Sequence, residues 1–254
     1  MRAGTLPGMT FEPISRQSVS DQVFGRLRDA IVSGRYAADE ALPSERELSA
    51  TFEVNRHAVR EALRRLQQLG LVQVSQGGAT RVLDWRATAG LDLTMALAGA
   101  EDVLPVATLE RDVLEMRACI GADAARLCAE RAAPGARAAI TEAVDRYAAA
   151  IPDLARMGEA DLALWRRIIE GSGNIAYLLA FNSLTAGALA VGHVPAPRRT
   201  AELLDVAAHR RLSDQIARGD VAGAQRTARE LLALTAIGAA AAHDEAGETT
   251  SERG

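Results

Sequence analysis

Residues 44–83 contain the pattern that most restricts the fold of this chain, because the spacing of their apolar residues changes abruptly. Up to residue 70 the apolar side chains recur every three to four positions, as on one face of a helix. From residue 71 the stretch LVQVSQGGATRVL alternates apolar and polar residues around a Gly-Gly pair, which predicts a β-hairpin. A further amphipathic helix is expected at about residues 20–33. Three helices followed by a two-stranded hairpin outline a winged helix-turn-helix.

The ends of these segments carry residues that start and stop helices. Ser44 followed by Glu47 matches a capping box, in which each side chain accepts a hydrogen bond from the other residue's backbone. Asn55 is a favourable cap for a third helix over residues 55–69, and Gly70 is suited to end it. The second and third helices are therefore expected to be separated by only a tight turn.

Beyond residue 85 the pattern is helical almost throughout, which predicts a mainly α protein with an all-α helical bundle after the winged domain. Breaks at Gly and Pro residues divide this part. Helices are expected at residues 89–99, 104–132, 136–150, 153–170, 174–191, 200–218 and 221–243. The expected division is a flexible tail at 1–14, a winged helix-turn-helix domain at 15–84, a linker helix at 85–102, a helical-bundle domain at 103–243, and a disordered tail at 244–254.

Charge and composition exclude several classes of protein. The net charge is −4, which argues against wholesale coating of nucleic acid but allows a local basic face. Residues 1–85 hold 11 arginines against 10 acidic residues, so the acidic excess belongs to the rest of the chain. The chain has no run of about 18 apolar residues, so no membrane span is expected. Its N-terminal residues also lack the apolar core of a signal peptide. Cys119 and Cys128 lack metal-type spacing and are expected to be buried free thiols, so a cytoplasmic location is expected.

The third helix, NRHAVREALRRLQQLG, has two different faces. Arg56, Arg60 and Arg64 recur four apart on one face, with His57 beside them. Such a face suits the major groove of DNA, where the planar arginine fork can bond guanine O6 and N7 together. On an isolated helix the same face would indicate ordinary solvated surface, but the capped second helix, the short turn and the hairpin favour DNA binding. The opposite, apolar face is expected to be buried: Val59, Ala62, Leu63, Leu66 and Leu69.

These residues resemble the winged helix-turn-helix domain of the GntR family of bacterial transcription regulators. The resemblance is carried by LPSERELS and by the run V-N-R-x-x-V-R-E-A-L-x-x-L-x-x-x-G-L, which together span about 30 positions. Glu53 stands where many relatives have glycine in the turn, and we interpret it as a harmless difference. The resemblance implies DNA-binding roles for Arg46, Asn55, Arg56, His57 and Arg60, and for Gln76 and Gly77 at the tip of the wing.

The second half resembles the effector-binding domain of the FadR subfamily. The segments LEMRACIGADAARLCAERA, DLALWRRIIEGSGN and HRRLSDQIARGD carry this similarity. Many members of the subfamily bind a divalent metal through one Asp and three His, and that set falls here on Asp161, Trp165, His209 and Leu231. Indole is only a donor and leucine has no ligand atom, so no metal and no other cofactor is expected.

An apolar effector is expected in place of the metal. The stretch QGGATRVLDWRATAGLDL and the segment SGNIAYLLAFNSLTAG resemble the acyl-CoA-responsive FadR type. The expected effector-binding residues are Arg117, Asp161, Trp165, His209 and Leu231. Two alternatives stay open: the bundle has filled its core and lost its ligand, or Arg117 only pairs with a carboxylate such as Asp161.

The sequence therefore predicts a homodimeric, ligand-responsive transcription regulator that binds a short palindromic operator in double-stranded DNA. A long-chain acyl-CoA or related lipid acid is the expected effector, and control of lipid metabolism the expected role. An alternative is a regulator of organic-acid or sugar-acid metabolism that senses a small carboxylate. An enzyme using Asp161 and His209 lacks any supporting motif, and a ligand-independent architectural DNA binder would not need the specific arginine face.

Overall fold

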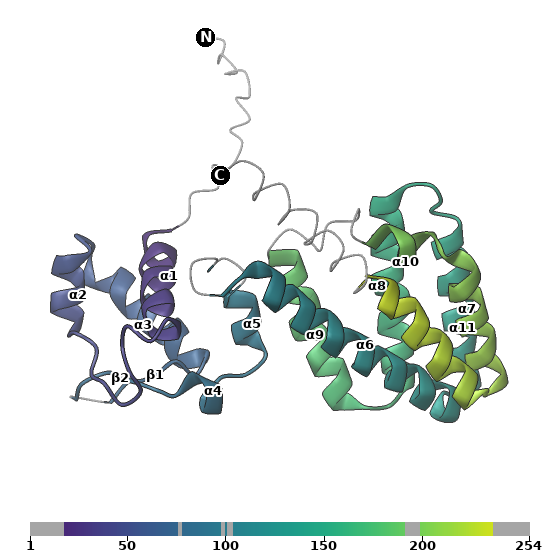
Figure 1. Cartoon of the computed structure of the whole chain (residues 1–254), viewed down its shortest axis with the longest axis horizontal. Coiled ribbons are helices and arrows are strands. Elements are labelled where there is room, and N and C mark those ends of the chain that lie inside the picture. Colours follow the sequence, from purple (N-terminus) through teal and green to yellow (C-terminus); the bar gives the residue numbers. More distant parts are fainter. Residues whose placement is uncertain (1–17, 76–77, 98–99, 101–103, 191–198, 236–254) are drawn as a thin grey trace, which may run out of the picture. The chain divides into compact units, whose positions relative to one another are not determined.

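The computed structural model describes residues 18–75, 78–97, 100, 104–190 and 199–235 (Figure 1). The chain divides into two compact units, Met1–Ala89 and Gly90–Gly254. The division falls inside the predicted linker, between helix α4 (Trp85–Thr88) and helix α5 (Asp92–Leu97). The expected tails at 1–14 and 244–254 lie outside the described residues.

The first unit is a winged helix-turn-helix, as the sequence predicts. Its helices are α1 (Val19–Val32), α2 (Glu45–Thr51) and α3 (Arg56–Gln68), followed by strands β1 (Val72–Gln73) and β2 (Arg81–Val82). α1 packs against α3 because each presents an apolar stripe at helical spacing. The buried side chains of this core include Val23, Leu27, Ile31, Leu48, Val59, Leu63, Leu66 and Leu71.

Capping residues fix the helix ends of this unit where the sequence indicates them. The Ser44 side chain accepts a hydrogen bond from the Glu47 amide, and Glu47 accepts from the Ser44 amide at 2.8 Å, which completes the capping box. Asn55 Oδ1 accepts from the Ala58 amide at 2.8 Å and starts α3. A second capping box at the start of α1, between Ser18 and Asp21, was not predicted.

The hairpin is shorter than its alternating sequence suggests. Val72 faces Val82 and Gln73 faces Arg81, so only two residues of each strand are paired. The loop before α2 lies on the other side of β2, where Ala41 bridges Arg81. The predicted wing-tip residues Gln76 and Gly77 lie outside the described residues.

The turn between α2 and α3 contains a residue in an uncommon backbone conformation. Glu53 has φ 54°, in the left-handed region that glycine adopts without steric cost. The glycine that many relatives have at this position therefore meets a backbone requirement. Glu53 carries a conformational cost that the interpretation of a harmless difference left out.

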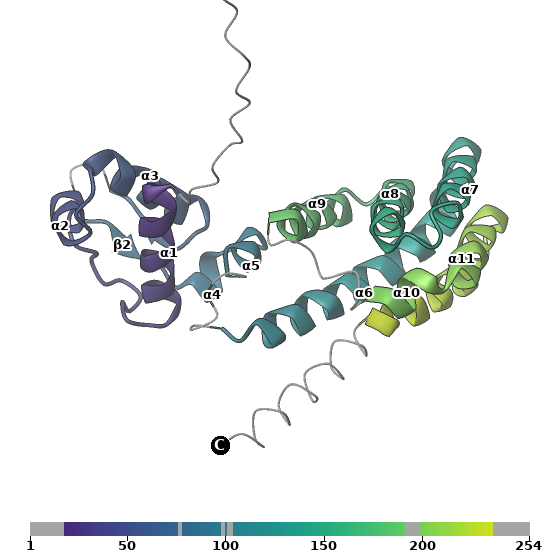
Figure 2. The ribbon, with the colours of Figure 1, turned by 90° about the horizontal axis from the view of Figure 1, so that it is seen from above.

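The second unit is all-α. Its helices after α5 are α6 (Val106–Arg131), α7 (Pro134–Ala148), α8 (Leu154–Gly171), α9 (Ile175–Ala190), α10 (Thr200–Leu204), α11 (Val206–Arg218) and a helix at 221–235. α6 runs along the unit and contacts α8, α9 and α11, while α7 packs on α8 and α11 (Figure 2). Among the described residues, no helix has the length and apolar character needed to cross a bilayer.

Two predictions for this unit are wrong. The expected single helix at 200–218 is divided into α10 and α11 at Asp205, whose side chain accepts a hydrogen bond from the Ala208 amide at 2.9 Å and starts α11. Cys119 is exposed rather than buried, whereas Cys128 is buried in the core as expected. Both thiols are free.

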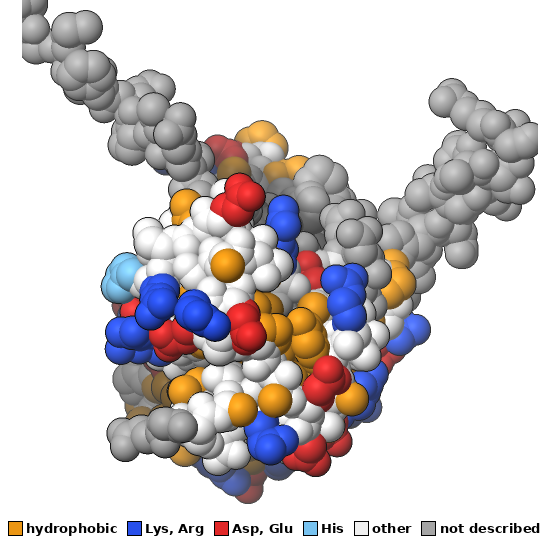
Figure 3. All heavy atoms as spheres, turned by 90° about the vertical axis from the view of Figure 1, so that its left-hand side faces the viewer, with side chains coloured by type: hydrophobic (Ala, Val, Ile, Leu, Met, Phe, Trp, Pro, Cys, Tyr) orange, Lys and Arg blue, Asp and Glu red, His pale blue; other side chains and the backbone are white. Residues whose placement is uncertain are grey.

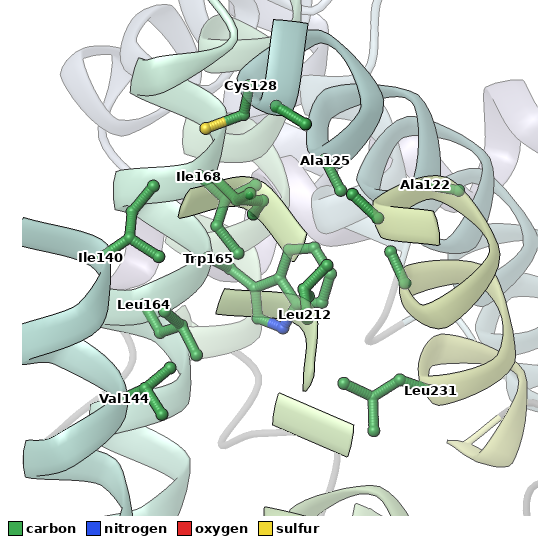
Figure 4. Close-up of a cluster of buried hydrophobic side chains, with 14 of the residues drawn as sticks. Ala122, Ala125, Cys128, Ile140, Val144, Leu164, Trp165, Ile168, Leu212 and Leu231 are labelled. Atoms are coloured by element: carbon green, nitrogen blue, oxygen red, sulfur yellow. The ribbon is translucent and has the colours of Figure 1, made fainter. Parts of the chain in front are cut away.

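Trp165 of α8 lies within the main apolar core of the bundle. Figure 4 shows its indole ring among Ile168, Leu212 and Leu231. Gly121 of α6 allows this packing, because a Cβ there would stand 2.4 Å from a Leu232 methyl group and 3.4 Å from the indole ring. The indole Nε1 is buried and has no hydrogen-bond partner among the described residues, which is an unfavourable contribution to stability.

Candidate functional site

The exposed face of α3 carries the side chains that the sequence predicts for DNA recognition. Ala58, Val59 and Ala62 are buried against the first unit's core, whereas Arg56 and Arg60 point to solvent. Asn55, His57 and, on α2, Arg46 are also exposed. Figure 3 shows basic side chains gathered with acidic ones on a face of this unit. This arrangement matches a recognition helix, whose first turns present polar groups while its back is anchored in the core.

Acidic neighbours hold part of this arginine face. Arg60 Nη2 lies 3.2 Å from Glu45 Oε2, and Arg64 Nη1 lies 2.8 Å from Glu61 Oε1. All four side chains are exposed, so these ion pairs are weak and can exchange for phosphate or base contacts. The face is therefore of mixed charge, with arginines and acidic side chains side by side.

A cavity of about 130 Å³ lies in the second unit between α6, α8 and α9. Three of the five predicted effector-binding residues line it: Arg117, Asp161 and Trp165. His209 lies next to Asp161 but is not part of the wall, and Leu231 belongs to the core while its neighbour Leu232 lines the cavity. Apart from Thr185 and Arg199, the other lining residues have no polar side chain: Val113, Leu114, Ile120, Gly121, Leu162, Ile169, Phe181, Leu184 and Leu232.

A buried network of charged groups closes one side of this cavity. Arg117 donates through both terminal nitrogens to Glu202, with Nη1 2.9 Å from Oε2. Arg199 Nη2 donates to Asp161 Oδ2 and lies 3.1 Å from Glu202 Oε1. His209 Nε2 is 3.3 Å from Asp161 Oδ1. Both carboxylates are fully buried, so each depends on these cations to remain ionised.

The pKa values of the network follow from this geometry. Burial alone would raise the pKa of Asp161, but Arg199, His209 and Arg117 together hold it below its ordinary range. Burial likewise opposes ionisation of Glu202, and Arg117 outweighs it, so the pKa of Glu202 is also lowered. Burial would lower the pKa of His209, but the contact with Asp161 raises it above its ordinary value. At all three groups, the neighbouring opposite charges therefore shift the pKa more than burial does.

The sequence did not predict that Arg199 and Glu202 belong to this network, or that Arg117 pairs with Glu202. Arg117 lies 3.9 Å from Asp161 but is bonded mainly to Glu202, and the close partner of Asp161 is Arg199. Asp161 lies in the middle of α8. Arg199 and Glu202 follow Pro197 in a polar stretch, PRRTAELL, which has the composition of exposed surface. No local pattern marks either residue as buried.

The residues at the subfamily's metal position do not form a metal site. Asp161 and His209 approach each other directly, and a guanidinium group already binds Asp161 Oδ2. Trp165 and Leu231 contribute apolar surface, and an indole N–H cannot bind a cation. Among the residues described by the structure, no three His, Cys, Asp or Glu side chains are grouped to hold a metal ion.

Comparisons with known proteins agree with this two-unit architecture. Residues 19–82 match the family model described as bacterial regulatory proteins, gntR family, and residues 112–234 match the FCD domain. The chain is 34% identical to the HTH-type transcriptional regulator Mce2R of Mycobacterium tuberculosis over 232 residues, 89% of this chain and 93% of that protein. It is 32% identical to the HTH-type transcriptional repressor NanR of Cronobacter sakazakii over 166 residues, 65% of this chain and 63% of that protein.

A solved structure gives the same fold at low sequence identity. Lar, which controls expression of the Listeria monocytogenes agr system, is 15% identical, with a TM-score of 0.52 over 89% of this chain and 98% of that one. The capped helix-turn-helix, the all-α second unit and the two family matches lead to one conclusion: this chain belongs to the GntR family of bacterial regulatory proteins, with an FCD domain following the DNA-binding domain.

Proposed function

We propose that this protein is a ligand-responsive transcription regulator that reads DNA with α3. The observation that carries the proposal is the exposed set Asn55, Arg56, His57 and Arg60 on a helix whose opposite face is buried. Arg46 on α2 is exposed, and we expect it to bind the phosphate backbone. A helix N-terminus such as that of α3 also attracts phosphate. The relatives named above are described as transcriptional regulators, which supports this reading.

The double substitution Arg56→Ala/Arg60→Ala tests the proposal. Duplexes bound by the full-length chain are first selected from a random library, and affinity for the best duplex is then measured by fluorescence anisotropy. We expect the variant to bind at least about tenfold more weakly, because one good bidentate base contact contributes roughly 1–3 kcal/mol. Arg210→Ala/Arg211→Ala on α11 is the matched control, since both of these arginines are exposed on a helix. Unchanged affinity in a folded Arg56→Ala/Arg60→Ala variant would exclude α3 as the recognition helix.

We propose further that the cavity beside Trp165 binds the effector, and that the effector is a fatty-acyl compound such as an acyl-CoA. The apolar wall supports this class. A volume of about 130 Å³ is less than half of the roughly 300 Å³ at the lower end of ordinary ligand sites, so a long acyl chain requires the cavity to enlarge. Such a ligand changes DNA binding only as far as it binds one arrangement of the protein better than another.

We also propose that the protein acts as a homodimer on a palindromic site. α9 supports a dimer, because it contains no charged residue and exposes Ile175 and Leu179, one turn apart on the same face. An apolar exposed helix face is typical of protein–protein interfaces. Twofold symmetry in the protein would then require twofold symmetry in the operator.

A further inference from the structure

The cavity wall contains two arginines, but both are paired with buried carboxylates. Arg117 and Arg199 both line the cavity, and both are already bonded to the buried carboxylates of Asp161 and Glu202. Counted with their buried partners, the two guanidinium groups and the two carboxylates give a net charge of zero, to which His209 behind Asp161 adds a positive charge only when it is protonated. The lowered pKa of each carboxyl keeps both carboxylates ionised at neutral pH, and His209 sits behind Asp161 rather than in the wall.

Breaking these pairs for an incoming anion is unfavourable. Asp161 and Glu202 are fully buried, so neither can turn to water if its arginine is withdrawn. A second anion placed beside them would also repel both carboxylates in a medium of low dielectric. Thr235 donates a further hydrogen bond to Glu202, which holds that carboxylate in place.

The two arginines nevertheless have N–H groups beyond those bonded to Asp161 and Glu202. A guanidinium group carries five N–H donors and no acceptor. Arg117 spends two nitrogens on Glu202 and its side chain remains partly exposed. The Nε of Arg199 is buried and has no hydrogen-bond partner among the described residues. A neutral carbonyl oxygen can accept from such donors without disturbing the charge balance.

We propose that the cavity encloses the uncharged acyl part of its effector, an apolar chain with a carbonyl acceptor such as that of an ester or thioester, and discriminates against the corresponding free carboxylate. The inference rests on the proposed effector-binding role of the cavity and names its ligand class. The carbonyl oxygen meets the arginine side of the wall, and the hydrocarbon part lies against residues such as Val113, Phe181 and Leu184. The cavity volume of about 130 Å³ restricts the enclosed part to several carbon atoms. A sensor of small carboxylates or sugar acids does not fit this wall.

Methyl hexanoate and hexanoate form a matched pair of probes, because they share one chain and differ in charge. Binding of each to the full-length chain is measured by isothermal titration calorimetry at pH 7.5. We expect methyl hexanoate to bind at least tenfold more tightly than hexanoate. Leu184→Trp fills the cavity from α9 and is expected to abolish binding of the ester, which locates the site.

The variant Glu202→Gln tests the charge argument directly. It keeps the shape of the side chain but removes one negative charge, so the network gains a net charge of +1 beside the cavity. We expect hexanoate to bind this variant at least tenfold more tightly than it binds the original protein. Asp161→Asn changes the charge in the same way and replaces Glu202→Gln if that variant fails to fold. Glu130→Gln, an exposed α6 carboxylate paired with Arg126, is the control that leaves the preference unchanged.

Three results would overturn the inference: preference for hexanoate in the original protein, no gain of hexanoate binding in a folded charge variant, or binding of neither probe. None of these results affects the DNA measurement with Arg56→Ala/Arg60→Ala, which is made without ligand. Failure of the ligand class and failure of the regulator function are therefore distinguishable.

Discussion

At the scale of single residues, His209 connects the buried charge network to pH. Its Nε2 faces Asp161 of α8, its Nδ1 lies 2.8 Å from the Asp205 carbonyl oxygen, and Tyr147 of α7 stacks on its ring at 4.4 Å between centroids. Glu202 of α10 also favours its protonated form. The raised pKa of His209 means that its protonated form stabilises the folded state.

A raised pKa gives a definite sign to the pH dependence. The stabilisation by His209 is complete below the pKa it has in the unfolded chain, about 6.5, and is lost as pH rises through the higher pKa of the folded state. Asp161 and Glu202 have lowered pKa values, so their stabilisation is present above about pH 4–5 and disappears only in acid. His209 is therefore the member of this network whose stabilising effect weakens as pH rises above about 6.5.

We expect the contribution of His209 to make the unfolding free energy fall as pH rises above about 6.5, and we expect this fall to be smaller in His209→Asn. Urea denaturation at several pH values measures how steeply the unfolding free energy of each protein changes with pH. The loss of packing on Tyr147 in His209→Asn lowers the unfolding free energy equally at every pH, so it does not change this slope. His57→Asn is the matched control, because His57 is exposed on α3. Equal slopes for His209→Asn and the original protein would contradict the assignment.

At the scale of secondary-structure elements, the turn between α2 and α3 sets the orientation of the recognition helix. Ser49 Oγ of α2 donates to the Val54 carbonyl oxygen, and the Val54 amide donates to the Ser49 carbonyl oxygen at 3.1 Å. Glu53 lies inside this closed turn with its positive φ. The turn thus confines Glu53 to a conformation that L-residues disfavour.

Glu53→Gly should stabilise the first unit by about 0.5 kcal/mol. Glycine removes the cost of roughly 1–2 kcal/mol that an L-residue has in the left-handed conformation. Glycine also makes the unfolded chain more flexible, which lowers the stability of the folded state by about 0.5–1 kcal/mol and so cancels part of this stabilisation. Thermal or urea unfolding of the full chain measures the change. Ala50→Gly provides the control with the opposite sign, because residue 50 lies within α2, where glycine destabilises by about 0.8–1 kcal/mol. Destabilisation by Glu53→Gly would show that the side chain has a role that outweighs its backbone cost.

At the scale of the whole molecule, the exposed face of α9 carries the proposal of a dimer. Ile175 is 68% exposed and Leu179 is 59% exposed, which is unusual for large apolar side chains one turn apart on a helix. The same helix uses Phe181, Leu184 and Thr185 to line the cavity. A ligand in the cavity and a partner subunit would therefore contact one helix from different sides.

Ile175→Glu/Leu179→Glu should raise the dimer dissociation constant by at least about tenfold, which corresponds to roughly 1.4 kcal/mol. Sedimentation or light scattering over a range of protein concentrations measures it. Ile151→Glu, in the turn between α7 and α8 and 49% exposed, is the matched control and should leave the association unchanged. A dimer that survives the double substitution, or one that dissociates equally in Ile151→Glu, would place the interface elsewhere.

The sequence by itself determines the features of this protein that arise from local physics. Ser44, Glu47 and Asn55 cap helices through hydrogen bonds to residues three positions away, so their roles can be read without the fold. The change in apolar spacing at residue 71 predicts the hairpin, and the two faces of α3 predict which arginines are exposed. The approximate extent of most helices follows from the same periodicity.

Only the tertiary structure decides the charge state of the cavity. Arg117 and Glu202 are 85 residues apart in the chain, and Asp161 and Arg199 are 38 apart. In sequence, the segment PRRTAELL has the composition of exposed surface, and no local pattern shows that Arg117 pairs with Glu202, because burial and pairing leave no local mark on a charged residue. Packing of α6, α8 and α10 brings two guanidinium groups and two carboxylates together, and their mutual neutralisation is the basis for proposing that the cavity encloses an uncharged acyl group.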